Sequence, residues 1–131
     1  MNDDTLFGVI EIAENETETS LKIDMPVWIR EGKGEDNNLY AFLPFFGLTT
    51  YGSTQEDLDT AIEEALICFF KAAKQFGGGI DKELKAIGWE KNTTLIAYTT
   101  QPQSRFSVHN TTPMFSEMAK TGERMELCVQ I

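Results

Sequence analysis

The stretch TQEDLDTAIEEALICFFKAAKQF, residues 54–76, decides the fold. Its apolar side chains recur every three or four residues, which places them on one face of a helix. They are Leu58, Ala61, Ile62, Ala65, Leu66, Phe69, Phe70, Ala73 and Phe76. Thr54 with Asp57 offers a cap for the first turn, and Ser53 with Glu56 offers another. The apolar stripe is wide, so the helix is expected to lie across a sheet or another helix.

Short segments of alternating polarity precede this helix. In LKIDMPVWI, residues 21–29, every second residue is apolar, as in a strand with one buried face. The apolar positions are Leu21, Ile23, Met25, Val27 and Ile29. Pro26 has no backbone donor, which predicts a sheet edge or a bend at that point. The sequence predicts strands over 6–13, 21–29, 39–43 and 48–51.

The chain returns to strands after GGG at 77–79, which ends the long helix. A second helix over 80–90 would present Ile80, Leu84 and Ile87. Further strands are predicted over 93–99, 105–110 and 125–131, with a helical turn over 113–120. The order predicts an α+β fold in one domain, 1–131, with one long helix packed on a face of an antiparallel sheet and additional C-terminal strands.

Two cysteines, Cys68 in the long helix and Cys128 in the last strand, are too few for a disulfide framework. Both are expected to be half-buried thiols.

The charge of the chain limits the classes of partner. There are 21 acidic residues against 11 basic ones, a net charge of −10. The basic residues do not cluster, which argues against direct binding of nucleic acid. An acidic surface suits a basic partner, although it also serves solubility alone. No signal segment or long apolar run appears, so we expect a cytoplasmic, bacterial protein without a membrane anchor.

No catalytic or metal-binding motif emerges. The acids at the start of the long helix lie on one solvent face, whereas two-metal chemistry needs carboxylates from several elements. His109, the single histidine, has Ser107 two residues away but no orienting acid nearby in sequence. We therefore expect no enzyme activity, no cofactor and no metal.

Residues 39–66, LYAFLPFFGLTTYGSTQEDLDTAIEEAL, resemble the HicB antitoxin family. In that family a strand ends near a proline, a glycine and a short strand follow, and G-x-T leads into an acidic helix containing EAL. The matching positions are Pro44, Gly47, Gly52, Thr54 and Glu64-Ala65-Leu66. The loop PFFGL differs from the family's P-D-L-P-G-C. Residues 6–90 would form the HicB-like core, and 91–131 a strand-rich extension unlike the family's DNA-binding module.

The resemblance implies a trimmed ribonuclease-H-like sheet and a non-enzymatic antitoxin that covers a small basic toxin. Phe45, Phe46 and Tyr51 would then be partly exposed anchors beside an acidic helix face. The candidate partner-binding residues are Phe45, Phe46, Tyr51, Glu56, Asp59 and Glu63. Neighbouring residues on a strand point opposite ways, so core packing of at least one of the two phenylalanines is the competing expectation.

Two other readings remain open. The first is a small ligand-binding domain or enzyme whose pocket is lined by the aromatic residues Trp28, Tyr40, Phe42 and Tyr98. A pocket that held His109 next to a carboxylate would favour it. The second is a homo-oligomeric scaffold without another partner. In either case the strand edge at 125–131 is a natural pairing site, and a two-fold homodimer is the default assembly.

Overall fold

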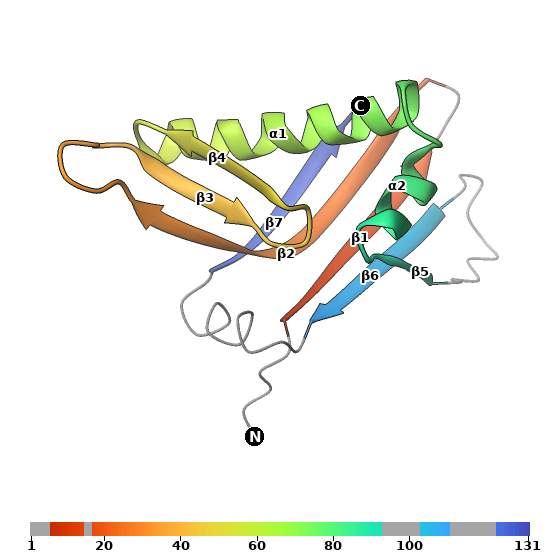
Figure 1. The fold of residues 1–131 in the computed structure, drawn as a ribbon. Coiled ribbons are helices and arrows are strands. Elements are labelled where there is room, and N and C mark those ends of the chain that lie inside the picture. Colours follow the sequence, from red (N-terminus) through yellow and green to blue (C-terminus); the bar gives the residue numbers. More distant parts are fainter. Residues whose placement is uncertain (1–5, 15–16, 93–102, 111–122) are drawn as a thin grey trace.

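The computed structural model describes residues 6–14, 17–92, 103–110 and 123–131. Strands and helices within these residues form an α+β fold with an antiparallel sheet (Figure 1). The strands are β1 (Leu6–Glu14), β2 (Thr19–Glu31), β3 (Leu39–Leu43), β4 (Leu48–Gly52), β5 (Glu90–Asn92), β6 (Gln103–Asn110) and β7 (Glu123–Gln130). The helices are α1 (Gln55–Gln75) and α2 (Ile80–Ala86).

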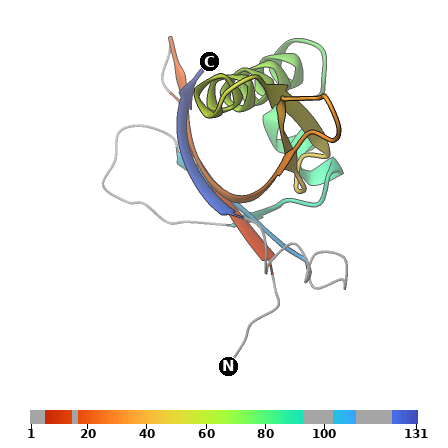
Figure 2. The ribbon, with the colours of Figure 1, turned by 90° about the vertical axis from the view of Figure 1, so that its left-hand side faces the viewer.

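The strands join in the order β4-β3-β2-β1-β6-β5, and β7 pairs with β2. Every pairing between them is antiparallel. The sheet curves around α1, which lies inside the curve between β7 and β4 (Figure 2). The C-terminal strands β6 and β7 therefore belong to the same sheet as β1 and β2.

Strand β2 is the longest strand and pairs with three neighbours. Its first part pairs with β1 and β7, and its last four residues pair with β3. Thr19 and Ile131 exchange both backbone hydrogen bonds, so the odd-numbered residues of β2 bond to β7. The backbone N–H and C=O groups of the even-numbered residues face β1, so the N–H that Pro26 lacks would have pointed to that side. Pro26 lies just beyond the last β1 pair, Val9 with Asp24, so no pair of the β1 ladder is interrupted there. A proline is thus accommodated in the middle of a strand.

The core lies between α1 and the concave face of the sheet. Five residues of α1 are buried: Leu58, Ile62, Leu66, Phe70 and Ala73. They face the apolar positions of β2, where Leu21, Ile23, Met25 and Val27 are all at most 2% exposed, as their alternation predicts. Phe76, expected in the stripe, is 86% exposed because it lies past the end of α1, at its C-cap.

Helix α2 ends earlier than the predicted range 80–90. Gly88 has φ of 103°, a conformation that reverses the chain, and the amide of Trp89 donates to the carbonyl of Leu84. Ile87 is consequently 39% exposed, while Trp89 enters the core and Glu90 begins β5, a strand that the sequence did not predict. The predicted strand at 93–99 and turn at 113–120 lie outside the described residues.

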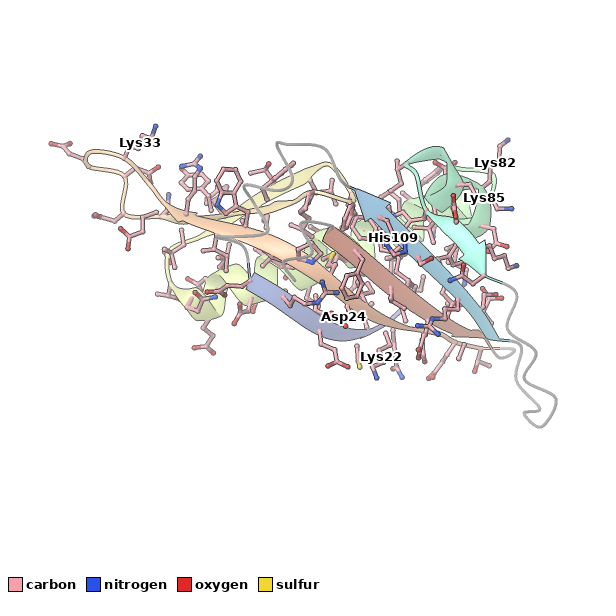
Figure 3. All side chains as sticks on the ribbon, turned by 90° about the horizontal axis from the view of Figure 1, so that it is seen from below. Lys22, Asp24, Lys33, Lys82, Lys85 and His109 are labelled. Carbon is pink, nitrogen blue, oxygen red and sulfur yellow. The ribbon has the colours of Figure 1, made fainter. Side chains whose placement is uncertain are left out.

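The expectation of half-buried cysteines is wrong, because Cys68 and Cys128 are both exposed. Cys68 lies on the solvent side of α1, off the buried stripe. Cys128 alternates with the buried Val129 and therefore points to the face of the sheet opposite α1. We call this the open face, because neither described helix covers it; Figure 3 looks onto it, with Lys22, Asp24 and His109 labelled.

Candidate protein-interaction site

The loop between β3 and β4 turns its aromatic residues inward. Phe45 is 5% and Phe46 is 6% exposed, so the expectation that they are partly exposed anchors is wrong. The amides of Phe46 and Gly47 both donate to the carbonyl of Leu43, and Gly47 takes φ of 65°, which folds the loop tightly. The loop therefore returns both rings to the core beneath α1.

Both rings pack against other aromatic side chains. Phe46 meets Phe69 and Phe70 edge to face, with ring centroids 5.3 and 5.9 Å apart. The indole nitrogen of Trp89 donates to the carbonyl of Phe45 across 3.2 Å. The sequence did not pair this loop with Trp89, which lies 44 residues away and follows a helix that was expected to run through it.

Tyr51 is 62% exposed, but it does not lie beside the acids of α1. The next residue, Gly52, faces α1 so closely that an added Cβ would lie 2.4 Å from the backbone nitrogen of Leu58. Because neighbouring strand residues point to opposite faces, Tyr51 belongs to the open face. There it packs against Tyr40, with ring centroids 5.9 Å apart, and the Arg30 guanidinium lies 4.4 Å above the Tyr40 ring.

The acids of α1 form an exposed surface of their own. Glu56, Asp59 and Glu63 follow the i, i+3, i+7 spacing and share one side of the helix; we call them the acidic stripe. Asp57 and Glu64 are exposed beside them. The ion pairs found in the described residues join other side chains: Lys22 with Glu126, Lys91 with Asp81, and Arg124 with Asp24.

Helix capping accounts for part of this negative charge. The amide of Asp57 donates to the Thr54 hydroxyl across 3.1 Å, so Thr54 is the N-cap. Asp57 itself accepts from Ser53, and first-turn acids are stabilised by the helix dipole. That stabilisation fades after the first turn, so Glu63 and Glu64 gain little from it. Helix capping and the helix dipole therefore do not account for the negative charge of Glu63 and Glu64.

A cavity of about 680 Å³ lies across β6, β1, β2 and β7 and next to α1, and Glu63 of the acidic stripe is among its lining residues. Its lining includes an open-face row, Arg105, Glu11 and Lys22, which strand pairing sets side by side. Lys22 also bonds to Glu126 at 3.2 Å, and this hydrogen bond and the carboxylate's charge raise the pKa of Lys22. The sequence analysis did not predict this row of charges, because its three members come from three strands whose pairing no local pattern specifies.

The aromatic residues expected to line a pocket do not line this one. Trp28, Tyr40 and Phe42 lie on the open face over β2 and β3, away from the cavity lining, and Tyr98 lies outside the described residues. His109 is exposed and tilts against the Phe7 ring, with centroids 6.4 Å apart. Ser107 accepts a hydrogen bond from the Asn92 amide across 3.0 Å. His109 is not among the residues that line the cavity, so the expected pocket with His109 next to a carboxylate is not this cavity.

Comparison with known proteins adds no family: no protein-family model, no curated protein and no solved structure matches the chain. Among the described residues, neither helix has the length and apolar character needed to cross a membrane.

Proposed function

We propose that this chain is a non-enzymatic interaction protein, HicB-like in its fold, that binds a small basic protein through the acidic stripe of α1. The observation that carries the proposal is the exposed charge of Glu56, Asp59 and Glu63, which no ion pair within the described part of the chain neutralises. Complementary charge across an interface speeds encounter and selects the partner. As an antitoxin, the chain would cover the active face of its basic partner with this surface.

Two further features support the proposal. The stripe lies on a helix fixed from below by five buried side chains, so its carboxylates are held on a rigid support. The strand, loop, short strand and capped acidic helix at 39–66 also follow one another in the order of the HicB motif. The phenylalanines of the loop take no part in this surface, and Tyr51 would serve only a partner that also reaches the open face.

The experiment is a pull-down of the full chain, expressed together with its immediate gene neighbours, with the retained species identified by mass. We expect a small basic protein held at one-to-one stoichiometry. The matched test is the triple variant Glu56→Gln, Asp59→Asn, Glu63→Gln, which keeps the size of each side chain and removes the charge. It should weaken binding about tenfold or more, since three charge contacts are lost.

The control variant removes as much charge elsewhere. Glu31→Gln, Glu35→Gln, Glu90→Gln changes three exposed acids away from α1 and should bind as the wild type does. If both triple variants lose affinity equally, net charge and not the stripe governs binding. A wild-type chain that returns only itself would contradict the proposal outright.

The cavity favours a second candidate function, the binding of a small amphipathic ligand. Its lining combines apolar side chains such as Ile67 and Val129 with the charges of Lys22 and Arg105. Lys22 forms an ion pair with Glu126, and Arg105 lies opposite Glu11 in the paired strands, so this surface mixes both signs of charge whereas the acidic stripe carries one. Native mass spectrometry of the chain purified from cells tests this candidate: a retained small molecule that Arg105→Gln releases would support it, and a chain of bare mass would not.

A further inference from the structure

Strand β7 has one unpaired edge among the described strands. It bonds to β2 over Ser20–Val27, and no other described strand lies against it. Ile131 and Thr19 exchange both backbone hydrogen bonds, so the odd-numbered residues of this segment face β2. The even-numbered residues of β7 therefore direct their N–H and C=O groups to the free edge. Figure 2 shows this strand at one end of the curved sheet.

The edge carries exposed charges at Glu123, Arg124 and Glu126, but it lacks the other features that usually protect an unpaired strand. Glu123–Gln130 contains no lysine and no proline, and its pairing with β2 is continuous, without a bulge. Its apolar side chains alternate on the α1 side of the sheet. Val129 is buried there, while Met125, Leu127 and Ile131 pack against the core only in part. The apolar side chains of β7 therefore leave exposed apolar surface beside a strand edge whose N–H and C=O groups are unpaired among the described strands.

The sequence of this edge is complementary to itself when two copies run antiparallel. With Cys128 opposite Cys128 of the second copy, Leu127 faces Val129 and Met125 faces Ile131 on the α1 side. On the open face Glu126 meets Gln130, so no like charges are opposed. Sliding one strand by two residues toward the start of β7 sets Glu123 against Ile131, and sliding it by four sets Glu126 against its own copy. Sliding it by two the other way sets Val129 against its own copy and pairs fewer described residues, 127–131 instead of 125–131.

We propose that the β7 edge is a homodimer interface, in which two copies of this chain pair β7 with β7 across a two-fold axis between their Cys128 residues. The two sheets then form one continuous sheet, and the half-exposed apolar row of each copy covers that of the other. An isologous contact of this kind closes on itself and leaves no further edge at β7. The inference is independent of the acidic stripe and of any basic partner.

Charge at position 128 tests the register directly, because in this dimer residue 128 faces only itself. Cys128→Ser is the control and should dimerise as the wild type does in sedimentation velocity under reducing conditions. Cys128→Glu and Cys128→Lys each oppose like charges and should raise the dissociation constant about tenfold or more. An equimolar mixture of the two should recover the affinity of Cys128→Ser, because opposite charges then meet.

Each variant is first checked for wild-type thermal unfolding, which the exposure of Cys128 leads us to expect. The proposal is overturned if the wild type stays monomeric at every concentration, if Cys128→Glu dimerises like Cys128→Ser, or if the mixture associates no better than its components.

Mild oxidation gives a second readout that needs no charged variant. Opposite residues of a hydrogen-bonded antiparallel pair lie about 5.5 Å apart at Cα, within the range that a disulfide spans. The Cys68→Ser chain should form a covalent dimer through Cys128, and the Cys128→Ser chain should not. Equal cross-linking of both variants, or of neither, would contradict the register.

Discussion

At the scale of single residues, one arginine explains how a proline fits within β2. Continuing the β1 register would set Pro26 opposite Phe7, whose carbonyl would lack a ladder donor there. Arg124, the β7 neighbour of Pro26, donates to that carbonyl across 3.0 Å and to the Asp24 carboxylate across 3.1 Å. Its guanidinium also lies 4.0 Å above the Phe7 ring. A side chain thus replaces the missing backbone donor.

Because the Arg124 side chain takes the place of the donor that Pro26 lacks, the effects of mutating Arg124 and Pro26 on the free energy of unfolding should depend on each other. Arg124→Ala should destabilise the wild type by about 1 kcal/mol, because the hydrogen bonds it loses are partly exposed. The same Arg124→Ala change should lower the free energy of unfolding by less in a Pro26→Ala background, because the backbone N–H of residue 26 can then donate to the Phe7 carbonyl. Urea unfolding of the four chains of the double-mutant cycle measures the difference. Equal costs in both backgrounds would show that Arg124 acts through its ion pair with Asp24 alone.

Trp89 makes a second residue-scale prediction. It is 1% exposed, and its indole nitrogen bonds to the Phe45 carbonyl. Trp89→Phe removes that donor and part of the ring from a packed core, so we expect a loss of about 2–3 kcal/mol in the free energy of unfolding. Trp28→Phe, at a position 41% exposed, is the matched control and should change it by less than about 0.5 kcal/mol. Comparable losses would contradict the placement of Trp89 in the core.

Asp36 and Tyr40 give a prediction for pH. The Tyr40 hydroxyl donates to the Asp36 carboxylate, and this bond, together with the backbone amide of Asn38, lowers the pKa of Asp36. The same bond to Asp36, with burial of the ring, raises the pKa of Tyr40. The stability that Asp36 contributes is thus present above its unfolded pKa and lost as pH falls through the lowered value. The stability that Tyr40 contributes is present below its unfolded pKa and is lost as pH rises through the raised pKa of the folded state.

Tyr40→Phe should therefore raise the pKa of Asp36 toward its ordinary value. Titration of the Asp36 carboxyl carbon by NMR, in the wild type and in the variant, measures this. An unchanged pKa would mean that the Asn38 amide alone holds the carboxylate in its charged form.

At the scale of elements, the contact between β4 and α1 decides how the helix meets the sheet. A Cβ on Gly52 would lie 2.4 Å from the Leu58 nitrogen, inside the first turn of α1, where backbone cannot yield easily. Gly52→Ala should cost about 1–3 kcal/mol, as overpacked sites do. At Gly78 the atom met is the flexible end of Lys82, so Gly78→Ala is the control and should cost much less in thermal unfolding. A tolerated Gly52→Ala would contradict this close approach.

The elements also show what the sequence could predict. The stripe of α1 and the alternation of β2 were read correctly, because one buried face imposes a period on each. The early end of α2 was missed although Gly88 is a local stop signal, and the short strand β5 was missed because burial of Trp89 depends on tertiary contacts. The candidate site was predicted in part: solvent exposure of the α1 acids followed from periodicity, whereas burial of Phe45 and Phe46 depends on a turn whose direction no local pattern specifies.

At the scale of the whole molecule, the candidate surfaces belong to different elements, and they meet where Glu63 of α1 lines the same cavity as Val129 of β7. The acidic stripe occupies the outer side of α1, the self-complementary edge lies at β7, and the open face carries mixed charge and aromatic residues. A net charge of −10 favours basic partners over acidic ones. Binding through the stripe should therefore weaken as ionic strength rises, since exposed charges are screened.

The most direct test of the proposed binding surface is hydrogen–deuterium exchange of the full chain, alone and with the basic partner that the pull-down is expected to identify. We expect slower exchange on binding to centre on residues 54–64, the capped and acidic half of α1, and added salt to reverse it. Slower exchange confined to the open-face strands β1 and β6, with residues 54–64 unchanged, would contradict the account and place the partner on the other side of the sheet.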